Sequence, residues 1–375
     1  MTQEQGKRRA VDPMRHHREN GWDYKGRAIY HFTLPVEERY PLFGVLDGES
    51  AETAGVSLNA FGRRVCQMLS GLAHFYEKKG FALKVLAQMV MPDHVHLVIQ
   101  VLEPLPQSIG AVVRGFKSGC TKVYKEVYGS GQNAAEVHGG EDAAPMHFAR
   151  IFASRGSIWQ EDKAYYHERI LHAPGQLRRM IDYVKDNPRR LWIKSHNPEL
   201  FRLHRRTEAA GLLFTSMGNH FLLEWPDRQV VEMSRNATNE EVQERLRMVL
   251  AAAHNGTVTY TAAISEGEKL IARTLREQGY PLVVLLNDGF PKEGSPHERY
   301  YKPGGVYFEA CSRGQLLLME PTEEAFRDEG VMAAAEESLR KKAEARHYSY
   351  TPIPLTSQRY RFIALNEMGK RLVGE

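Results

Sequence analysis

Cysteine is scarce in this chain. Its 375 residues include three, Cys66, Cys120 and Cys311, which are widely separated. An odd, scattered set excludes a disulfide scaffold and fits a reducing compartment, so we expect a cytoplasmic protein. No Cys-x-x-Cys pair occurs, so the sequence gives no support for a structural zinc site.

Long apolar runs are also missing. No stretch of about 18 apolar residues occurs, so we expect no membrane span and no membrane partner. The first residues, Met1 to Arg9, lack an apolar core, so we expect no secretion signal. Hydrophobic residues make up 42% of the chain, which is enough for sizeable cores. The length predicts two domains, and a monomer is the favoured state.

Positive charge is distributed unevenly. Residues 1–200 carry 27 Lys and Arg against 22 Asp and Glu, whereas the remainder carries 23 against 24. Residues 1–27 are basic and poor in apolar residues, which predicts a flexible arm that could reach along nucleic acid. A solvated tail explains the same composition equally well. The first half is therefore the expected phosphate-binding half.

The most informative stretch is Met91–Ile99, with the sequence MPDHVHLVI. His94 and His96 are two residues apart in an apolar, β-branched run, so in a strand both project to the same face. Two imidazoles on one face form half of a divalent metal site. We expect both side chains to be half exposed in a cleft. Half-buried polar residues without a metal remain the alternative.

A second informative stretch runs from Gln176 to Pro188. Its spacing predicts an amphipathic helix that stops near Asn187, because proline disfavours a helical residue before it. Arg179, Tyr183 and Asn187 are four residues apart and share one face of this helix. Tyrosine can attack phosphorus, and an amide oxygen can complete a metal site begun by His94 and His96. A tyrosine at a helix–core boundary is the simpler reading of this helix alone.

Together these stretches resemble the single-tyrosine HUH transposases, most closely the REP-associated tyrosine transposases. The matching pieces occur in the family's order: Val90–His96, Phe116-Lys117-Ser118, Ile158-Trp159-Gln160, and Asp182-Tyr183 through Asn187-Pro188. The similarity covers roughly residues 20–195. The chain departs from the family in an insertion, residues 129–148, and in its whole C-terminal half, which short members lack.

The resemblance implies a metal-dependent endonuclease and strand transferase that cuts single-stranded DNA beside hairpins. It implies Tyr183 as the nucleophile that forms a 5′-phosphotyrosine, with Mg²⁺ or Mn²⁺ held by His94, His96 and Asn187. The expected DNA-binding residues are Arg114, Lys117, Lys122, Trp159, Gln160 and Arg179. Further aromatic residues that could stack on bases are Trp22, Tyr24, Phe116 and Tyr124.

The first half should form an α+β domain over residues 28–196. We expect an antiparallel sheet with helices packed on it, because strands and helices follow in blocks. The predicted strands are Ala28–Leu34, Pro41–Leu46, Phe81–Val90, His94–Leu102 and residues 163–171. The predicted helices are Leu58–Lys79, Pro106–Tyr128 and the Tyr183 helix. The insertion at 129–148 is predicted to be a loop.

The second half, residues 197–375, alternates strands with helices and predicts a three-layer α/β domain. It loosely resembles the Rossmann-like domains of the DNA-processing and lysine-decarboxylase-like nucleotide-binding superfamily. In such a fold, ligands bind at the carboxyl ends of the strands. Candidate ligand residues are Ser265, Glu266, Gly267, Asn287 and Asp288. The capping box formed by Ser265 and Glu268 explains part of this pattern without a ligand.

Three other functions stay open at this point. The chain could be a domesticated DNA-binding protein that does not cut, or a nucleotide-binding protein that acts through its C-terminal domain. It could also be a hydrolase that uses His94 and His96 without a covalent intermediate.

Overall fold

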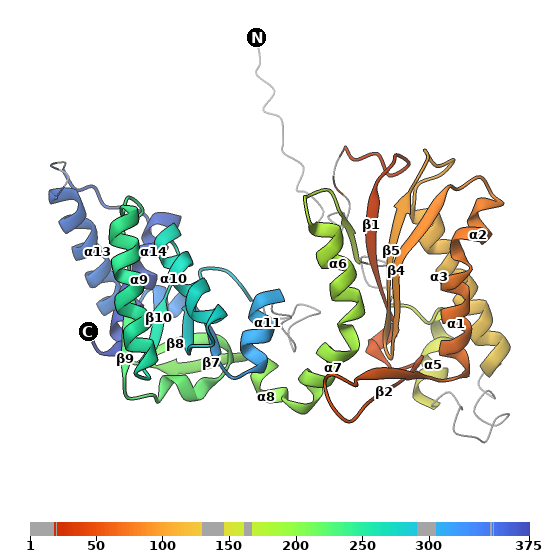
Figure 1. The fold of residues 1–375 in the computed structure, drawn as a ribbon, viewed down its shortest axis with the longest axis horizontal. Coiled ribbons are helices and arrows are strands. Elements are labelled where there is room, and N and C mark those ends of the chain that lie inside the picture. The colour runs from red at the N-terminus through yellow and green to blue at the C-terminus, as the bar shows by residue number, and fades with distance from the viewer. Residues whose placement is uncertain are drawn as a thin grey trace, which may run out of the picture. The chain divides into compact units, whose positions relative to one another are not determined.

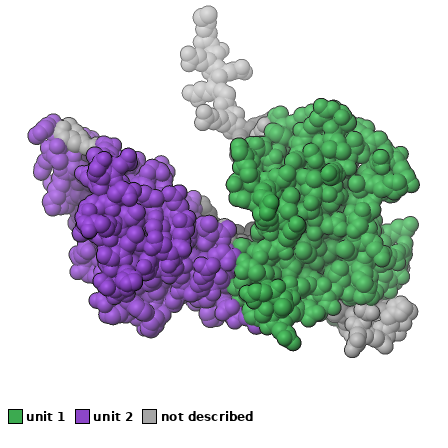
Figure 2. Space-filling model, in the orientation of Figure 1, with its two compact units in different colours: residues 1–193 green, residues 194–375 purple. Residues whose placement is uncertain are grey.

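The structure is a computed structural model that describes residue 19 and residues 21–129, 146–160, 167–290, 305–345, 347 and 349–375. Internal contacts divide the chain into two compact units, residues 1–193 and residues 194–375 (Figure 2). The functional domains 28–196 and 197–375 stay a prediction. None of the helices among the described residues is long and apolar enough to cross a membrane.

The centre of unit 1 is a four-stranded antiparallel sheet with the strand order β4-β5-β1-β6. Its strands are β1 (Ile29–Pro35), β4 (Leu83–Met91), β5 (His94–Val101) and β6 (His167–Ile170). A separate two-stranded ribbon consists of β2 (Gly44–Asp47) and β3 (Gly55–Leu58). The antiparallel α+β architecture expected for this half is therefore present.

Helices cover both faces of the unit 1 sheet (Figure 1). The helical elements are η2 (Glu37–Arg39), α1 (Ala60–Ser70), α2 (Leu72–Glu77), α3 (Gly110–Tyr128), α5 (Met146–Arg155), α6 (Gln176–Lys185) and α7 (Asn187–His196). The main core joins Val95 and Leu97 of β5 to residues of α1 and α3. A smaller cluster on the opposite face joins Val98 to Met180 and Val184 of α6. The strand alternation thus separates a core face from a face covered by α6.

Several elements of unit 1 differ from the sequence prediction. The strand expected at Pro41–Leu46 is β2, which pairs with β3 and not with the main sheet. The helix expected from Leu58 begins only at Ala60, because Leu58 ends β3 and the Asn59 side chain caps α1. That helix also ends early, since Gly71 separates α1 from α2.

Helix α5 was not predicted. It begins at Met146, inside the segment expected as a loop over 129–148, while residues 130–145 lie outside the described residues. The expected basic arm is described only in part. Residues 21–27 form turns, and Trp22 and Tyr24 pack against the main core. The break near Asn187 is confirmed: α6 ends at Lys185 and α7 begins at Asn187, with Pro188 in its first turn.

Unit 2 contains a six-stranded sheet with the order β7-β8-β12-β11-β10-β9. Its strands are β7 (His204–Ala209), β8 (Leu212–Gly218), β9 (Arg228–Val231), β10 (Val258–Thr261), β11 (Leu282–Leu285) and β12 (Leu316–Pro321). Strands β9 to β12 are parallel, while β7 and β8 form an antiparallel hairpin that pairs with β12. The parallel centre follows from the alternation of strands and helices along this half.

The helices of unit 2 lie on both faces of its sheet. They are α8 (Pro198–Phe201), η3 (His220–Leu223), α9 (Asn239–His254), α10 (Glu266–Glu277), α11 (Gly305–Ser312), α12 (Glu323–Phe326), α13 (Glu329–Glu344) and α14 (Gln358–Val373). Helices α12 to α14 share one core with alternate residues of the strands. Among the described residues that core takes none from α9, α10 or α11, which contact β10 to β12 and cover the other face. Unit 2 is thus a three-layer α/β arrangement.

Gly62 permits a close approach between α1 and the chain before β2. A Cβ atom at Gly62 would lie 2.0 Å from the Phe43 carbonyl oxygen. We predict that Gly62→Ala destabilises unit 1 by about 1–3 kcal/mol, although alanine favours a helix by about 1 kcal/mol. Gly55→Ala is the matched control, because no atom lies within 4 Å of a Cβ there. Equal free energies of unfolding in urea for Gly62→Ala and Gly55→Ala would contradict this packing.

Candidate active site

His94 and His96 face the same side of the unit 1 sheet, as predicted from the alternation of β5. Val95 and Leu97 are fully buried in the core on the other side, which fixes the direction of both histidines. The expected half exposure is wrong. His96 is 2% exposed, and the His94 side chain is 11% exposed. They are covered because residues of α6 and of β1 pack on this face.

Helix α6 brings Tyr183 to these histidines. Met180 and Val184 are buried against Val98 of β5, which holds the helix on this face of the sheet. The ring of Tyr183 meets the His96 ring edge to face, with 5.5 Å between centroids and 74° between planes. Tyr183, the predicted nucleophile, and His96, a predicted metal ligand, are thus neighbours, although 87 positions separate them in the sequence.

Asp93 determines the tautomer of neutral His94. The His94 Nδ1 atom lies 2.5 Å from Asp93 Oδ1. A carboxylate only accepts hydrogen bonds, so Nδ1 carries the hydrogen and Nε2 keeps its lone pair. Arg39 lies 3.3 Å from the other Asp93 oxygen and forms an ion pair with it. A carboxylate behind a histidine in this way commonly orients a metal ligand.

The Nε2 atoms of His94 and His96 lie 3.0 Å apart. Two bare lone pairs at this distance repel, so the pair needs a proton or a cation between the nitrogens. Two ligands about 2.1 Å from one metal and at right angles lie about 3 Å apart, so the spacing fits two adjacent metal ligands. Within the described part of the chain, no three His, Cys, Asp or Glu side chains are arranged to hold a metal ion. Further ligands would have to be other groups, such as an amide, water or substrate.

Asn187 is the third predicted ligand and begins α7. It is buried, and its Nδ2 donates a hydrogen bond of 2.8 Å to the Tyr183 carbonyl one turn earlier. This bond uses the amide nitrogen, whereas a metal would need the amide oxygen. The bond also links the start of α7 to the residue expected to attack phosphorus. The role of Asn187 as a metal ligand stays a prediction.

The sequence analysis missed His31 and Thr33, which extend the cluster onto β1. Thr33 pairs with His96 in the strand register, and its Oγ1 lies 3.1 Å from His96 Nδ1. The His31 Nε2 atom lies 3.0 Å from the same Nδ1. Burial, followed by the charges of Arg169 and His94, lowers the pKa of His31 to about 4. A signal was present, because these two polar residues alternate with the buried Tyr30, Phe32 and Leu34.

Arg190 is a third residue that the sequence analysis missed. It is buried on α7, and the central carbon of its guanidinium lies 5.5 Å from the centroid of the Tyr183 ring. Asp186 is held mainly by Arg189, at 2.6 and 3.1 Å, and lies 3.9 Å from Arg190. The ring of Tyr183 therefore contacts His96 and a buried cation.

The predicted stacking role of Trp159 is wrong for this structure. Trp159 is 1% exposed and packs in the main core, where its Nε1 donates to the Lys117 carbonyl at 3.0 Å. Phe116 and Tyr124 are buried in the same core. A base cannot reach any of these rings unless the core opens. Gln160 is half buried, and its backbone N–H donates to the Pro35 carbonyl.

The predicted basic residues lie on both faces of the sheet. Arg179 is exposed on α6, the helix that carries Tyr183. Arg114, Lys117 and Lys122 lie on α3, which packs on the opposite face of the sheet (Figure 1). Lys117 is also buried, so its position fits a core contact better than a phosphate contact. Arg179 thus lies on the helix that covers the histidine face, whereas the α3 residues lie on the opposite face, and their DNA-binding roles stay a prediction.

In unit 2, the capping box at the start of α10 is confirmed. Ser265 Oγ accepts from the Glu268 N–H. The Glu268 carboxylate accepts from the N–H groups of Met233, Ile264 and Ser265, so it joins the ends of β9 and β10. This network explains why a carboxylate that is 1% exposed is tolerated there.

The other predicted ligand residues of unit 2 have separate surroundings. Glu266 is exposed and paired with Lys269. Gly267 packs against Met233 and Val242. Asn287 Oδ1 accepts from Arg361 Nε at 2.9 Å, and Asp288 is exposed. Of the five predicted residues, only Ser265 lines the pocket of unit 2 described next.

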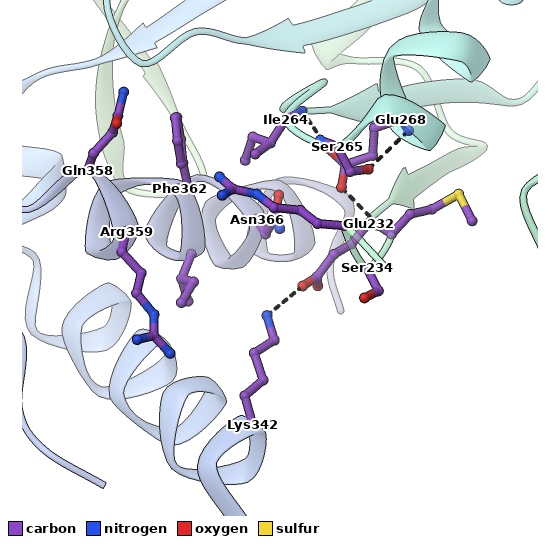
Figure 3. Close-up of a pocket in the computed structure, with 13 residues that line it drawn as sticks. Glu232, Ser234, Ile264, Ser265, Glu268, Lys342, Gln358, Arg359, Phe362 and Asn366 are labelled. Atoms are coloured by element: carbon purple, nitrogen blue, oxygen red, sulfur yellow. Dashed lines mark hydrogen bonds and ion pairs between the residues drawn. The ribbon is translucent and has the colours of Figure 1, made fainter. Parts of the chain in front are cut away.

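That pocket has a volume of about 770 Å³ and lies at the carboxyl ends of β9 and β10 (Figure 3). Gln358, Arg359, Phe362 and Asn366 project into this region from the first turns of α14, and Lys342 comes from α13. Arg235, Glu232 and Glu268 also line it.

The two acids of the pocket are compensated. Glu268 is held by three backbone N–H groups. Burial raises the pKa of Glu232, but hydrogen bonds and charges from Lys370 and Lys342 outweigh burial, so that pKa lies below its usual value. Arg235 adds a cation that lies 5.5 Å from the centroid of the Phe362 ring. The lining can therefore accept an anionic ligand.

Comparisons with known proteins give few matches. No family model and no curated protein matches the chain. Similar solved structures include a REP-associated tyrosine transposase bound to a REP hairpin, at 16% identity and a TM-score of 0.25, covering 46% of this chain and 72% of that one. Another is a Deinococcus radiodurans R1 protein with a provisional transposase description, at 15% identity and a TM-score of 0.25, covering 46% and 96%. Similarity at this level does not define the fold or activity of this chain.

The lowered pKa of His31 predicts how the metal-free protein responds to acid. Between pH 6.5 and pH 4 the unfolded chain binds a proton at His31 that the native state excludes. The free energy of unfolding of unit 1 should therefore fall with falling pH, by at most about 1.4 kcal/mol per pH unit from this group. The groups that face His31 are His94, His96, Arg169 and Tyr183.

The measurement is urea unfolding in EDTA from pH 7 to pH 4, for the wild type and His31→Gln. The variant lacks the titrating group, so its free energy of unfolding should fall less steeply between pH 6.5 and pH 4 than that of the wild type. Equal slopes would contradict the buried, neutral state of His31.

Proposed function

We propose that unit 1 is a metal-dependent single-stranded DNA endonuclease and strand transferase of the transposase type. It would cut next to DNA hairpins through a 5′-phosphotyrosine at Tyr183. The observation that carries this proposal is the contact of the Tyr183 ring with His96, whose Nε2 lies 3.0 Å from His94 Nε2. The specificity for hairpins is supported only by the sequence resemblance.

The proposal includes the finer assignment of both folds. Residues 28–196 would be an HUH nuclease domain, for which the antiparallel sheet and the paired histidines on its central strand are the support. Residues 197–375 would be a Rossmann-like domain, supported by four parallel strands with helices on both faces.

The chemistry assigned to this chain is a transesterification. Tyr183 Oη attacks a backbone phosphorus, the Oη–P bond forms, and the bond from phosphorus to the 3′ oxygen breaks. The phenol loses its proton and the 3′ oxygen gains one, so protons balance. The phosphodiester becomes a phosphotyrosine of similar energy, and strand transfer then needs no ATP.

Residues around Tyr183 would support this reaction in different ways. His94, His96 and Asn187 are the residues that would hold Mg²⁺ or Mn²⁺, and imidazole ligands favour Mn²⁺ at least as much as Mg²⁺. When bound, the metal would polarise the phosphate oxygens. Arg190, next to the Tyr183 ring, favours the negative charge that develops as the phenol loses its proton. The hydrogen bond from Asn187 Nδ2 to the Tyr183 carbonyl joins the start of α7 to the end of α6 beside the expected nucleophile.

We predict that Tyr183→Phe abolishes the covalent protein–DNA adduct with hairpin-flanked single-stranded DNA and Mn²⁺. The variant loses one hydroxyl group, so affinity for the same DNA should change by less than about tenfold. Tyr40→Phe is the control, because Tyr40 is a half-buried tyrosine of the same unit that packs on Phe148.

Intact-protein mass spectrometry measures the adduct. An adduct on Tyr183→Phe would show that another residue attacks, with Tyr165 and Tyr166, outside the described residues, as the next candidates. Cutting by Tyr183→Phe without an adduct would indicate a hydrolase. Hairpin binding by the wild type without cutting would indicate a domesticated DNA-binding protein.

A second candidate function belongs to unit 2. Its pocket, with a volume of about 770 Å³, has the size of small-molecule sites, about 300–1,000 Å³. A nucleotide-like anion would suit this lining. Its two acids are compensated, Arg235 and Arg359 are cations, and Phe362 provides an aromatic ring. We include nucleotide binding by the C-terminal domain as the alternative function, which could operate beside DNA cleavage.

We predict that nucleoside monophosphates raise the melting temperature of the wild-type chain and that Arg235→Gln removes this shift. Removing the cation next to Phe362 should weaken anion binding without opening the core. Arg247→Gln is the control, because Arg247 is exposed and paired with Glu244 on α9. Equal shifts for Arg235→Gln and the wild type, or no shift with any monophosphate, would contradict this site.

A further inference from the structure

The histidine cluster contains one imidazole for which neither the sequence analysis nor the proposed function gives a role. His31 lies on β1, next to the strand that carries His94 and His96, and is 7% exposed. Its ring stacks on the His96 ring, with 5.1 Å between centroids and 25° between planes. It also meets the Tyr183 ring edge to face at 6.4 Å. A polar ring placed so deeply needs a specific partner.

That partner is His96. The 3.0 Å contact between His31 Nε2 and His96 Nδ1 is a hydrogen bond only if the two nitrogens share one hydrogen. Its direction decides which nitrogen of His96 can bind a metal. If His96 Nδ1 carries the hydrogen and donates it, Nε2 keeps its lone pair and faces His94 Nε2 at 3.0 Å. The opposite tautomer would place a hydrogen on Nε2 and block it as a ligand.

We infer that His31 is a positioning residue that accepts the Nδ1–H of His96 and thereby holds His96 in the tautomer whose Nε2 can bind a metal. The inference rests on the proposed metal-dependent function of unit 1. His31 then does for His96 what Asp93 does for His94. The two ligands receive different support, a charged carboxylate for His94 and a neutral imidazole for His96.

The neutral state that this role requires agrees with the surroundings of His31. His31 is 7% exposed, and burial this deep disfavours the charged imidazolium. A neutral imidazole has one nitrogen that accepts, and Nε2, the nitrogen next to His96 Nδ1, can take that role. An imidazolium would carry hydrogens on both nitrogens and could not accept from His96.

Thr33 is the competing acceptor. Its Oγ1 lies 3.1 Å from the same His96 Nδ1, and it stands opposite His96 in the strand register. A hydroxyl can donate or accept, as a neutral imidazole can, but it rotates about one bond and makes no ring contact that orients His96. The ring of His31 also stacks on His96 and restricts its rotation. We therefore assign the selection to His31 and a secondary contact to Thr33.

The test compares His31→Gln with His31→Met in the full-length protein. The two side chains have similar length and volume, but only the glutamine amide oxygen can accept strongly from His96 Nδ1. We expect His31→Met to weaken Mn²⁺ binding about 10- to 100-fold, the usual effect of losing the partner behind a metal-bound histidine. His31→Gln should retain affinity to within a few-fold. Calorimetric titration with Mn²⁺ measures both.

A second readout follows the tautomer itself. ¹⁵N NMR of the Mg²⁺-loaded wild type should show a hydrogen-bond coupling between His96 Nδ1, which carries the hydrogen, and His31 Nε2, because a bound metal alone fixes the tautomer but not its acceptor. Thr33→Val, in which a methyl group replaces the hydroxyl, should change Mn²⁺ affinity less than His31→Met does. The melting temperature of each variant checks that it is folded.

Two results would overturn the role of His31. One is wild-type Mn²⁺ affinity in folded His31→Met. The other is a loss of affinity in Thr33→Val that exceeds the loss in His31→Met. Failure of the proposed function looks different, because the wild type itself would then bind no Mn²⁺ and form no adduct. If His31→Met does not fold, the coupling between His96 Nδ1 and His31 Nε2 in the wild type decides, and its absence would overturn the role of His31.

Discussion

The antiparallel pairing of β1 with β5 is the constraint on which the candidate site depends. Its register places Thr33 opposite His96 and His31 opposite Val98. Because side chains alternate along a strand, a shift by one residue would send His94 and His96 into the core and bring Val95 to the surface. The burial of Val95 and Leu97 therefore fixes the direction of both histidines, and no separate interaction is needed to aim them.

A cluster of polar rings beneath a helix is stable only if each ring has a partner. Asp93 supports His94, while His31 and Thr33 support His96, so both potential metal ligands are held from behind. Helix α6 closes the cluster by packing around Val98, and the same packing delivers Tyr183. The fold thus creates a site in which the expected attacking oxygen and the expected metal ligands depend on one sheet face.

The sequence predicted the parts of this site that follow from local periodicity. The alternation around Val95 gave the shared face of His94 and His96, and the amphipathic pattern around Tyr183 gave α6. The sequence did not predict His31, since its meaning depends on which strand pairs with β5. It also misassigned Trp159, because an aromatic residue near a basic helix can stack on a base or fill a core. Only the packing of α3 decides between them. In unit 2, the capping box was local and was predicted, whereas the pocket needed β9, β10, α13 and α14 together.

The proposed metal site requires one cation bound between two nitrogen atoms. Anomalous diffraction from crystals soaked in Mn²⁺ locates that cation without relying on activity. We predict a peak about 2.1 Å from the Nε2 atoms of both His94 and His96, on the side of the sheet covered by α6. A Mn²⁺ peak bound elsewhere in unit 1, with both nitrogens left in contact with each other, would contradict it.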